Sequence, residues 1–375
     1  MSLHHFTLVT HVVRRGDGQG RVNLEVVREA LRQDLSVTIV ASEIAPELEH
    51  NSKVRWVRIR SRGIPSHFLR EQVFALRSVI ALRRLQSGPL LSNGCITRIP
   101  ADVNACHFVH SSWLQSPVHT SKLTGGFKGA YQKFYSVANA RLEKSAYRQA
   151  GVVVSVSDQV RRELMAIGID PAKIQTIPNG VDTDEFVPGH ADRSRFGLPM
   201  EVPLALFAGD IRSPRKNLDT VLRAMVSVPE LHLAVAGGLE GSPFPAMAAE
   251  LGLADRVHFL GSVREMPELM RSCDVFAFPS RYEACSLVML EAMASGLPVI
   301  TARTTGGAEL VPEDGGFLLD NPDDGDTLVS ILRKVVADRP ALGALSQRAR
   351  ARALSLRWDE MGRKYLELLA QVKPK

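Results

Sequence analysis

Cysteine is scarce in this sequence, and long apolar runs are missing. The 375 residues include four cysteines, whose positions have none of the spacings typical of zinc sites or disulfide frameworks. We therefore expect reduced thiols rather than disulfides. No apolar run approaches the roughly 18 to 20 residues that a membrane-spanning helix needs, and the first residues do not form a basic-then-apolar signal peptide. Together these features predict a cytoplasmic protein.

Motifs for nucleic-acid and dinucleotide binding are also missing. No zinc-finger, RRM or helix-turn-helix signature is present. Aromatic residues make up only 6% of the chain and do not interleave with the basic ones, so we expect no nucleic-acid partner. Residues 15–20 are expected to form a flexible loop. The glycines of this segment lack the GxGxxG spacing of dinucleotide-binding enzymes, which disfavours an NAD-dependent dehydrogenase.

Positive charge is present but unevenly placed. The net charge is +6, and most of the excess lies in the N-terminal half, between Lys53 and Arg98. This excess favours an anionic partner, either a phosphorylated or lipid-linked acceptor or an anionic membrane surface. The membrane interpretation implies peripheral contact with the inner face of the cytoplasmic membrane. The alternative is a basic helix face that meets only solvent.

Short apolar runs alternate with amphipathic helical patterns along almost the whole chain. This alternation predicts parallel sheets covered by helices, an α/β fold. A turn-rich segment near residues 179–182 separates two such series. Glycines follow several expected strands, where ligand-binding loops lie in open α/β sheets. The expected strands of the second series span residues 204–208, 231–236, 257–260, 275–279 and 297–301.

The most informative segment spans residues 279–299. Its pattern predicts a buried strand ending at Pro279, a loop that carries Glu283, and a helix that starts near Ser286. The free N–H groups at such a helix end favour a bound anion such as a diphosphate. Glu291 falls on the second turn of a helix otherwise rich in apolar residues, so its carboxylate needs a partner or a cleft. The two carboxylates suit the hydroxyls of a sugar and a ribose.

This segment resembles the Glu-x7-Glu signature of the family-four retaining glycosyltransferases of GT-B fold. The resemblance extends over most of the chain. Residues 177–186 are similar to the segment that joins the family's two domains, and residues 206–217 to the first strand and phosphate-binding loop of its second domain. His110, in the segment 107–113, matches the family's histidine-bearing loop.

The resemblance implies a GT-B fold, in which two Rossmann-like domains have parallel sheets facing across a cleft. The expected domains are residues 1–186 for the acceptor and 187–355 for the nucleotide-sugar donor, with a C-terminal helix at 356–375 packing back on the first. The implied reaction moves a hexosyl unit, with retention, from a nucleotide-diphosphate sugar to a glycan or glycolipid. We expect a UDP-sugar before GDP-mannose as donor, and an anionic acceptor such as lipopolysaccharide core.

The resemblance also implies residue roles. Lys216, with Arg215 or Arg212, would bind the diphosphate and stabilise the leaving nucleoside diphosphate, so that no metal or other cofactor is expected. Glu283 and His110 would contact the transferred sugar, whereas His107 is expected to be a histidine satisfied within its strand. Besides Arg212, the expected donor-binding residues are Gly18, Gly20, Gly209, Val263, Ala284, Cys285, Ser286, Leu287 and Glu291.

The sequence departs from the family pattern near these residues. Asp210 stands where members often have arginine, and Asn217 follows Lys216 where they have glycine. Which arginine partners Lys216 is therefore left open. Cys285 and Ser286 replace part of the usual E-G-F-G pattern. Cys285 is not expected to act as a nucleophile, because no histidine is predicted beside it.

Further alternatives concern one segment and the overall function. Residues 116–132 mix glycine, lysine and aromatic residues, and we expect a loop that serves as an acceptor lid, a membrane contact or a plain exposed connection. A GT-B sugar-nucleotide epimerase or a sugar phosphorylase would use the same donor site. A non-catalytic nucleotide-sugar-binding scaffold would bind the donor without turnover.

Overall fold

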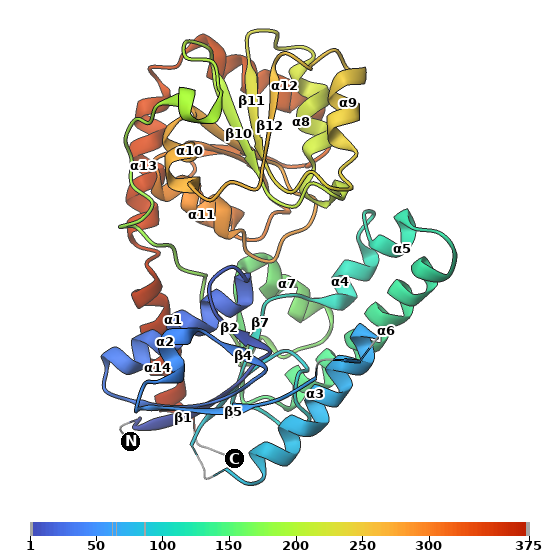
Figure 1. Ribbon diagram of the computed structural model, residues 1–375, viewed down its shortest axis with the longest axis vertical. Helices are drawn as coiled ribbons and strands as arrows, with labels where there is room; N and C mark the ends of the chain where they lie inside the picture. The colour runs from blue at the N-terminus through green and yellow to red at the C-terminus, as the bar shows by residue number, and fades with distance from the viewer. Residues whose placement is uncertain (1–2, 62, 65, 86–87, 373–375) are drawn as a thin grey trace. The chain divides into compact units, whose positions relative to one another are not determined.

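The computed structural model describes residues 3–61, 63–64, 66–85 and 88–372. Arg62, in the basic stretch, and residues 373–375 of the expected C-terminal segment lie outside them. The chain divides into two compact units, Met1–Gly180 with Trp358–Lys375 (unit 1) and Val181–Arg357 (unit 2). Each unit contains a parallel sheet flanked by helices (Figure 1), which confirms the predicted two-domain α/β fold. The first division point precedes the expected boundary at residue 186.

The large sheet of unit 1 has seven strands. These are β1 (His5–Val9), β3 (Ser36–Ala41), β5 (Val54–Arg58), β6 (Leu90–Asn93), β7 (Val103–Cys106), β8 (Val152–Ser155) and β9 (Ile174–Thr176). They lie in the order β5-β3-β1-β6-β7-β8-β9, with parallel neighbours throughout. The strand order therefore reverses between β1 and β6. In open α/β sheets, ligands bind at such a reversal, outside the carboxyl ends of the strands.

The helices of unit 1 and its minor strand pair follow from local sequence signals. Asp17, Ser66 and Ser157 cap helices by accepting hydrogen bonds from backbone N–H groups in the first turn. The minor pair is β2 (Val12–Val13) with β4 (Glu43–Ile44). The helices are α1 (Gly18–Arg32), α2 (Pro46–Glu49), α3 (His67–Leu82), α4 (His110–Gln115), α5 (Thr120–Leu123), α6 (Gly126–Gln149), α7 (Asp158–Ala166) and α14 (Trp358–Gln371).

Two expectations about unit 1 were wrong in detail. The segment 116–132, expected to be a loop, contains α5 and the first turns of α6. Gly18 and Gly20, expected in a loop, lie in the first turn of α1, where the Asp17 carboxylate accepts a hydrogen bond from the Gly20 N–H at 2.6 Å. In both places the capping and helix-forming residues produce a helix, although the glycines favoured the prediction of a loop.

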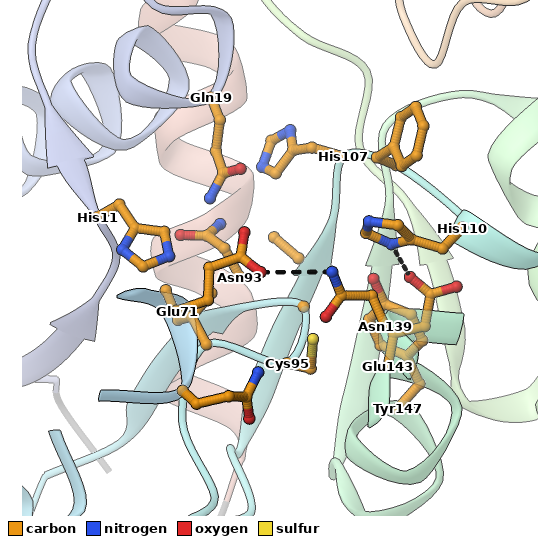
Figure 2. A pocket seen from close by; sticks show the side chains of 15 residues that line it. His11, Gln19, Glu71, Asn93, Cys95, His107, His110, Asn139, Glu143 and Tyr147 are labelled. Atoms are coloured by element: carbon orange, nitrogen blue, oxygen red, sulfur yellow. Dashed lines mark hydrogen bonds and ion pairs between the residues drawn. The ribbon is translucent and has the colours of Figure 1, made fainter. Parts of the chain in front are cut away.

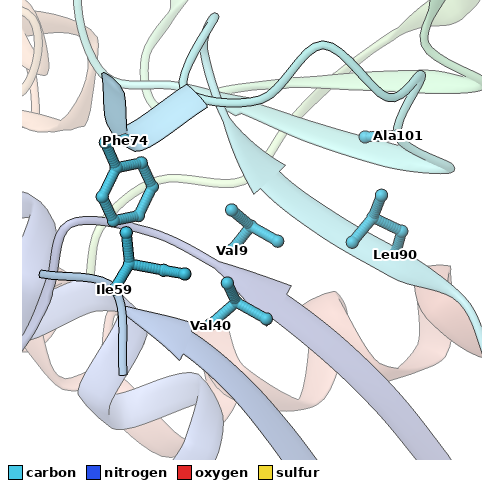
Figure 3. Close-up of a cluster of buried hydrophobic side chains, with 6 residues drawn as sticks. All are labelled: Val9, Val40, Ile59, Phe74, Leu90 and Ala101. Atoms are coloured by element: carbon cyan, nitrogen blue, oxygen red, sulfur yellow. The ribbon is translucent and has the colours of Figure 1, made fainter. Parts of the chain in front are cut away.

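A compact apolar cluster supports the centre of the unit 1 sheet (Figure 3). Val9 and Leu90 come from β1 and β6, the two strands at the order reversal, and Phe74 comes from α3. All three are buried. The cluster therefore fixes α3 against the strands that carry the ligand-binding edge. Its buried members are Val9, Val40, Ile59, Phe74, Leu90 and Ala101.

The last helix, α14, belongs to unit 1 and packs on α1. Their approach is close at Gly362, where an added Cβ would lie 2.6 Å from the Glu29 Cβ. The Arg21 guanidinium lies 5.2 Å from the centroid of the Trp358 ring. The chain therefore returns to unit 1 after unit 2 is complete, as the resemblance implied for the C-terminal helix.

Unit 2 repeats the same design with six strands. They are β10 (Leu204–Ala208), β11 (His232–Ala236), β12 (Val257–Gly261), β13 (Val275–Phe278), β14 (Val299–Ala302) and β15 (Gly316–Leu319). Their order is β12-β11-β10-β13-β14-β15, so it reverses between β10 and β13. The helices are α8 (Leu218–Met225), α9 (Phe244–Glu250), α10 (Met266–Arg271), α11 (Leu287–Ala294), α12 (Gly325–Ala337) and α13 (Leu342–Leu354).

Candidate active site

The order reversal in unit 2 brings together the residues expected to bind the donor. Lys216 follows β10, and Glu283 follows β13, the adjacent central strand. Their side chains form an ion pair and are both largely buried. The Lys216 ammonium also lies 5.3 Å from the centroid of the Phe278 ring. Two residues far apart in sequence are therefore in contact at the edge where ligands bind in such sheets.

The charge state of Lys216 reflects opposing influences. Burial and the nearby Arg215 charge lower the pKa of the Lys216 ammonium to about 7, although Asp210 favours the protonated form. The adjoining Glu283 carboxylate also favours the protonated form. An anion bound here would add to that stabilisation of the charged lysine.

The two candidate arginines have different surroundings. Arg212 is exposed, and its guanidinium is engaged by the Asp210 carboxylate at 2.8 Å. Arg215 is mostly desolvated, which lowers its pKa. Its guanidinium makes no hydrogen bond or ion pair with another described residue. Arg215 is therefore the arginine beside Lys216 that has charge available for a ligand.

Asn217 follows Lys216 at the position where family members have glycine, and its backbone and contacts explain the change. Its backbone is left-handed, with φ 68°, a conformation that asparagine tolerates better than most residues. The side chain is fully buried, and its amide donates hydrogen bonds to the carbonyls of Pro279 at 2.9 Å and Pro322 at 2.6 Å. Asparagine thus keeps the turn that glycine allows and also ties three loops together.

Arg281, which the sequence reasoning did not select, secures the Lys216 loop from the other side. Its guanidinium binds the Asp219 carboxylate at 2.8 Å and the Pro214 carbonyl at 2.7 Å. Its backbone N–H donates to the Arg215 carbonyl at 3.0 Å. These bonds couple the loop after β10 to the loop after β13. A lone arginine inside P-S-R-Y-E gave no signal of this positioning role.

The loop that carries Glu283 leads directly into α11. The helix starts next to Ser286, as the sequence predicted. Ser286 caps it, and its hydroxyl accepts a hydrogen bond from the Met289 N–H. The Gly306 N–H donates to the Glu283 carbonyl at 2.9 Å. A Cβ on Gly306 would lie 1.9 Å from the Ala284 carbonyl oxygen, so only glycine fits. Gly306, absent from the predicted set, therefore shapes this loop.

The other expected donor-binding residues lie in several places. Cys285 is a buried free thiol, and Glu291 is half-buried on the second turn of α11. Gly209 follows β10 directly, and a Cβ built on it would lie 3.5 Å from the Phe278 ring and 3.7 Å from the Lys216 side chain. Val263 lies two residues after β12, beyond β11 from the reversal point. Gly18, Gly20 and His110 belong to unit 1.

Unit 1 has its own pocket at its order reversal (Figure 2). It has a volume of about 150 Å³. Its walls follow the carboxyl ends of β1, β6 and β7, together with α3 and α6. The lining residues are His11, Gln19, Glu71, Gln72, Asn93, Gly94, Cys95, Ile96, Ala105, His107, Phe108, His110, Asn139, Glu143 and Tyr147.

His110 lines this pocket and is oriented by a buried carboxylate. Its Nδ1 is 2.7 Å from a Glu143 carboxylate oxygen (Figure 2). Burial raises the pKa of Glu143, while the hydrogen bond to His110 opposes that shift. With Nδ1 held by Glu143, Nε2 is the histidine nitrogen left for a ligand. His107 differs from its expectation, because its Nε2 is buried without a hydrogen-bond partner among the described residues.

Glu71 forms a second polar group in the pocket. Its carboxylate accepts hydrogen bonds from the Tyr135 hydroxyl at 2.6 Å and the Asn139 amide at 3.3 Å, and pairs with His67 at 3.3 Å. Burial alone would raise the pKa of Glu71, but the bonds from His67 and Tyr135 outweigh it and lower the pKa. Glu71 is therefore ionised at neutral pH.

The sequence reasoning missed most of this pocket, although α6 carries a signal for it. Tyr135, Asn139, Glu143 and Tyr147 are spaced by four residues and fall on one helix face. All are buried or half-buried, so polar residues repeat on the inward face.

No group of three or more acidic, histidine or cysteine side chains suited to a metal ion occurs in the part of the chain that the structure describes.

No helix within the described ranges combines the length and apolar character that a membrane span requires.

Each of the two units has a parallel sheet with polar and charged residues at its order reversal, and this architecture is that of the GT-B fold. The comparisons agree. Residues 16–185 match the model for Glycosyltransferase Family 4, and residues 190–352 match that for Glycosyl transferases group 1. Together the two models match most of the chain, which therefore belongs to the glycosyltransferases that combine these two domains.

Curated relatives carry one recurring name. A D-inositol 3-phosphate glycosyltransferase of Mycobacterium avium (strain 104) is 36% identical over 223 residues, covering 56% of this chain and 51% of the relative. One of Mycobacterium bovis (strain BCG / Pasteur 1173P2) is 32% identical over 283 residues, covering 71% and 57%. The chain thus spans little more than half the length of these relatives.

Solved structures show the same fold at low identity. A sucrose-phosphate synthase from Thermosynechococcus elongatus has a TM-score of 0.82 at 21% identity, covering 98% of both chains. WaaG, a glycosyltransferase involved in lipopolysaccharide biosynthesis, has a TM-score of 0.78 at 19%, covering 98% of this chain and 100% of WaaG. Anabaena HepE, in complex with UDP-glucose, has 0.73 at 19%, with 98% and 100% covered.

Proposed function

We propose that the protein transfers a hexosyl unit, with retention of configuration, from a nucleotide-diphosphate sugar to a glycan or glycolipid acceptor. The observation that carries this proposal is the buried Lys216–Glu283 pair, with the Arg215 guanidinium, unpaired among the described residues, beside it at the order reversal of unit 2. Two desolvated cations there suit a diphosphate, and the adjacent carboxylate suits sugar hydroxyls.

In this proposal the donor diphosphate replaces Glu283 as the partner of Lys216. Lys216, Arg215 and the backbone N–H groups around Ser286 and Leu287 stabilise the charge that develops on the leaving nucleoside diphosphate. Glu283, released from its lysine, accepts hydrogen bonds from the sugar. The leaving phosphate takes the proton of the acceptor hydroxyl on the face it departs from, so the configuration is retained. No step requires a metal ion or other cofactor.

His110 contacts a hydroxyl of the transferred sugar through Nε2, with Glu143 fixing the ring. Glu291 binds the ribose, as expected for a half-buried carboxylate on α11. Arg212, Val263 and the glycines at 18, 20 and 209 complete the predicted donor set. Among these, Arg212 has the weakest support, because Asp210 already occupies its guanidinium.

For the donor, we propose a UDP-sugar first and GDP-mannose second. One structural neighbour, Anabaena HepE, was solved in complex with UDP-glucose, which supports this order. Thermal unfolding with UDP, GDP, ADP and dTDP tests it, since a ligand that binds only the native state raises apparent stability. We expect one nucleotide to raise the Tm and Lys216→Ala to abolish that shift. No shift with any nucleotide would reject the donor assignment.

Product analysis tests the reaction itself. NMR of the product should show the anomeric configuration of the donor, and an inverted centre would end the retaining mechanism. Consumption of the nucleotide sugar without any acceptor product would instead favour an epimerase. Tight nucleotide binding with no turnover on any acceptor would favour the scaffold alternative.

For the acceptor, we propose a glycan or glycolipid bound by unit 1. The curated relatives are named for D-inositol 3-phosphate, and WaaG is involved in lipopolysaccharide biosynthesis, so both support acceptors rich in hydroxyls and anions. A lipopolysaccharide-core-like acceptor remains our first proposal for the whole acceptor molecule. The predicted anionic character rests on the basic residues of the N-terminal half.

We also propose peripheral contact with an anionic membrane through one face of unit 1. Leu69, Leu76 and Ile80 lie seven and four residues apart on α3 and are each more than half exposed. Phe127 on α6 is 90% exposed, and Phe134 lies on the same helix with its ring 5.3 Å from that of Phe68 on α3. Exposed lysines and arginines accompany these apolar side chains, as on helices that bind anionic bilayers.

A further inference from the structure

The pocket of unit 1 is polar but has no lysine or arginine among its described lining residues. Two of them, Glu71 and Glu143, are acids. Arg98 contacts the lining residue Gln72 but is itself exposed and outside the lining. The lowered pKa of Glu71 keeps its carboxylate charged, and its partner His67 lies outside the lining. A phosphate here would therefore face a like charge with no lysine or arginine to offset it, which is unfavourable in a desolvated site.

Unpaired polar atoms in the same pocket indicate what does fit. Asn93, at the end of β6, is only 3% exposed, yet neither its amide nitrogen nor its carbonyl oxygen has a hydrogen-bond partner within the described part of the chain. The same holds for the buried Nε2 atom of His107. Buried polar side chains are normally satisfied. The Asn93 amide nitrogen can donate a hydrogen bond to a ligand, and its carbonyl oxygen can accept one. The His107 Nε2 can do either, depending on the tautomer of the ring.

Hydroxyl groups match this combination, because each of them can donate one hydrogen bond and accept others. The pocket volume of about 150 Å³ is close to that of a cavity known to accept a six-membered aromatic ring, roughly 150 Å³. A sugar or cyclitol ring is larger than benzene because of its hydroxyls, so the pocket can hold at most one such ring and not an oligosaccharide.

We propose that this pocket binds one uncharged, polyhydroxylated six-membered ring of the acceptor and discriminates against a phosphorylated ring, with Asn93 and Glu71 as specificity-determining residues. This inference rests on the proposed function, because it takes the unit 1 pocket as the acceptor site. In this proposal the anionic partner and the neutral ring bind at different places. The anionic partner of the basic N-terminal half meets the exposed face of α3 and α6, and the uncharged ring binds in the pocket.

Matched pairs of probes test the proposal on the full chain without nucleotide. Dissociation constants for myo-inositol and myo-inositol 3-phosphate, and for methyl mannoside and mannose 6-phosphate, are measured by ligand-observed NMR. We expect the uncharged member of at least one pair to bind about tenfold more tightly than its phosphorylated partner. Asn93→Ala should weaken that binding about tenfold, whereas Gln175→Ala, at an exposed position of β9, should leave it unchanged.

A second variant keeps the test meaningful if Asn93→Ala does not fold. Gln72→Lys places a cation at the pocket wall and should raise the affinity for the phosphorylated probe about tenfold. Equal or tighter binding of the phosphorylated probes by the unaltered protein, or no binding of either uncharged ring, would overturn the inference. Donor binding is measured separately, so loss of the nucleotide-induced Tm shift would instead reject the proposed function.

Discussion

Asn217 shows how one side chain can compensate for an unusual residue choice. It stands in a left-handed turn, where glycine would also fit, and its buried amide satisfies two carbonyls from other loops. The amide therefore stabilises the geometry that presents Lys216. This explains the departure from the family pattern without any loss of the phosphate-binding loop.

Substitutions at Asn217 should separate backbone strain from hydrogen bonding. Asn217→Ala introduces a left-handed alanine and removes the hydrogen bonds to the buried Pro279 carbonyl and the half-buried Pro322 carbonyl, so we expect about 3 kcal/mol of destabilisation. Asn217→Gly relieves the strain and should lose about 1–2 kcal/mol. Thermal and urea denaturation measure both. An alanine variant as stable as the unaltered protein would show that the turn is not constrained.

Lys216 should make nucleotide binding depend on pH. With its pKa lowered to about 7, the ammonium is charged below that pH and loses its proton above it. The diphosphate binds the charged form, so affinity should fall as the pH rises, by roughly tenfold between pH 7 and 8.5. Calorimetry in buffers of different ionisation enthalpy should detect proton uptake on binding above pH 7.

A matched variant provides the control for this pH dependence. Lys216→Arg keeps the positive charge at every accessible pH, so its nucleotide affinity should be weaker but nearly independent of pH. A slope that persists in Lys216→Arg would assign the pH dependence to another group.

At the scale of elements, the contact between α1 and α14 depends on one glycine. A Cβ at Gly362 would meet Glu29 at 2.6 Å, so Gly362→Ala should destabilise the protein by about 1–3 kcal/mol through overpacking. Gly343 lies within α13, and no described atom is near its would-be Cβ. Gly343→Ala should therefore stabilise by roughly 0.5–1 kcal/mol. Denaturation curves that shift in the same direction would contradict this packing account.

The exposed face of α3 and α6 makes a separate prediction. Replacement of Phe127 and Phe134 by serine should reduce co-sedimentation with phosphatidylserine-containing vesicles several-fold, because apolar insertion and basic attraction act together. The Lys122, Lys128 and Lys133 triple alanine variant should weaken binding mainly at low salt. Leu354→Ser, at an exposed apolar position of unit 2, serves as the control. Vesicle binding unchanged in both test variants would remove the membrane proposal.

At the scale of the whole molecule, each unit should respond to its own ligand. Most of the proposed nucleotide contacts within unit 2 come from the loops after β10 and β13 and from α11. Hydrogen exchange with saturating nucleotide should therefore slow at residues 209–217 and 283–291. Exchange that slows only in unit 1 would place the nucleotide in the wrong unit for our proposal.

Much of the fold could be predicted from the sequence because its signals are local. Alternating apolar runs and amphipathic stretches gave the two parallel α/β units, and the serine at 286 gave the start of α11. The segment 116–132 was misjudged, because its glycines suggested a loop where two helices form. Glycine frequency is a weaker guide than the continuous helical pattern that follows.

The candidate site was predicted only in part. Lys216 and Glu283 were identified from motifs, and the structure brings them into contact. Glu71, Asn93 and Glu143 were not identified, since each lies in an ordinary helix or strand pattern. Only the folding of α3, α6 and β6 around one sheet edge makes these residues neighbours.

The sequence by itself determined most of the alternation of strands and helices along the chain, the family, and the cation and carboxylate motifs, because these depend on residues close together in the chain. Only the tertiary structure decided which arginine remains available beside Lys216 and why asparagine replaces glycine after it. The same is true of the absence of lysine and arginine from the described lining of the unit 1 pocket. These properties depend on hydrogen bonds and burial between residues distant in sequence, which no local pattern encodes.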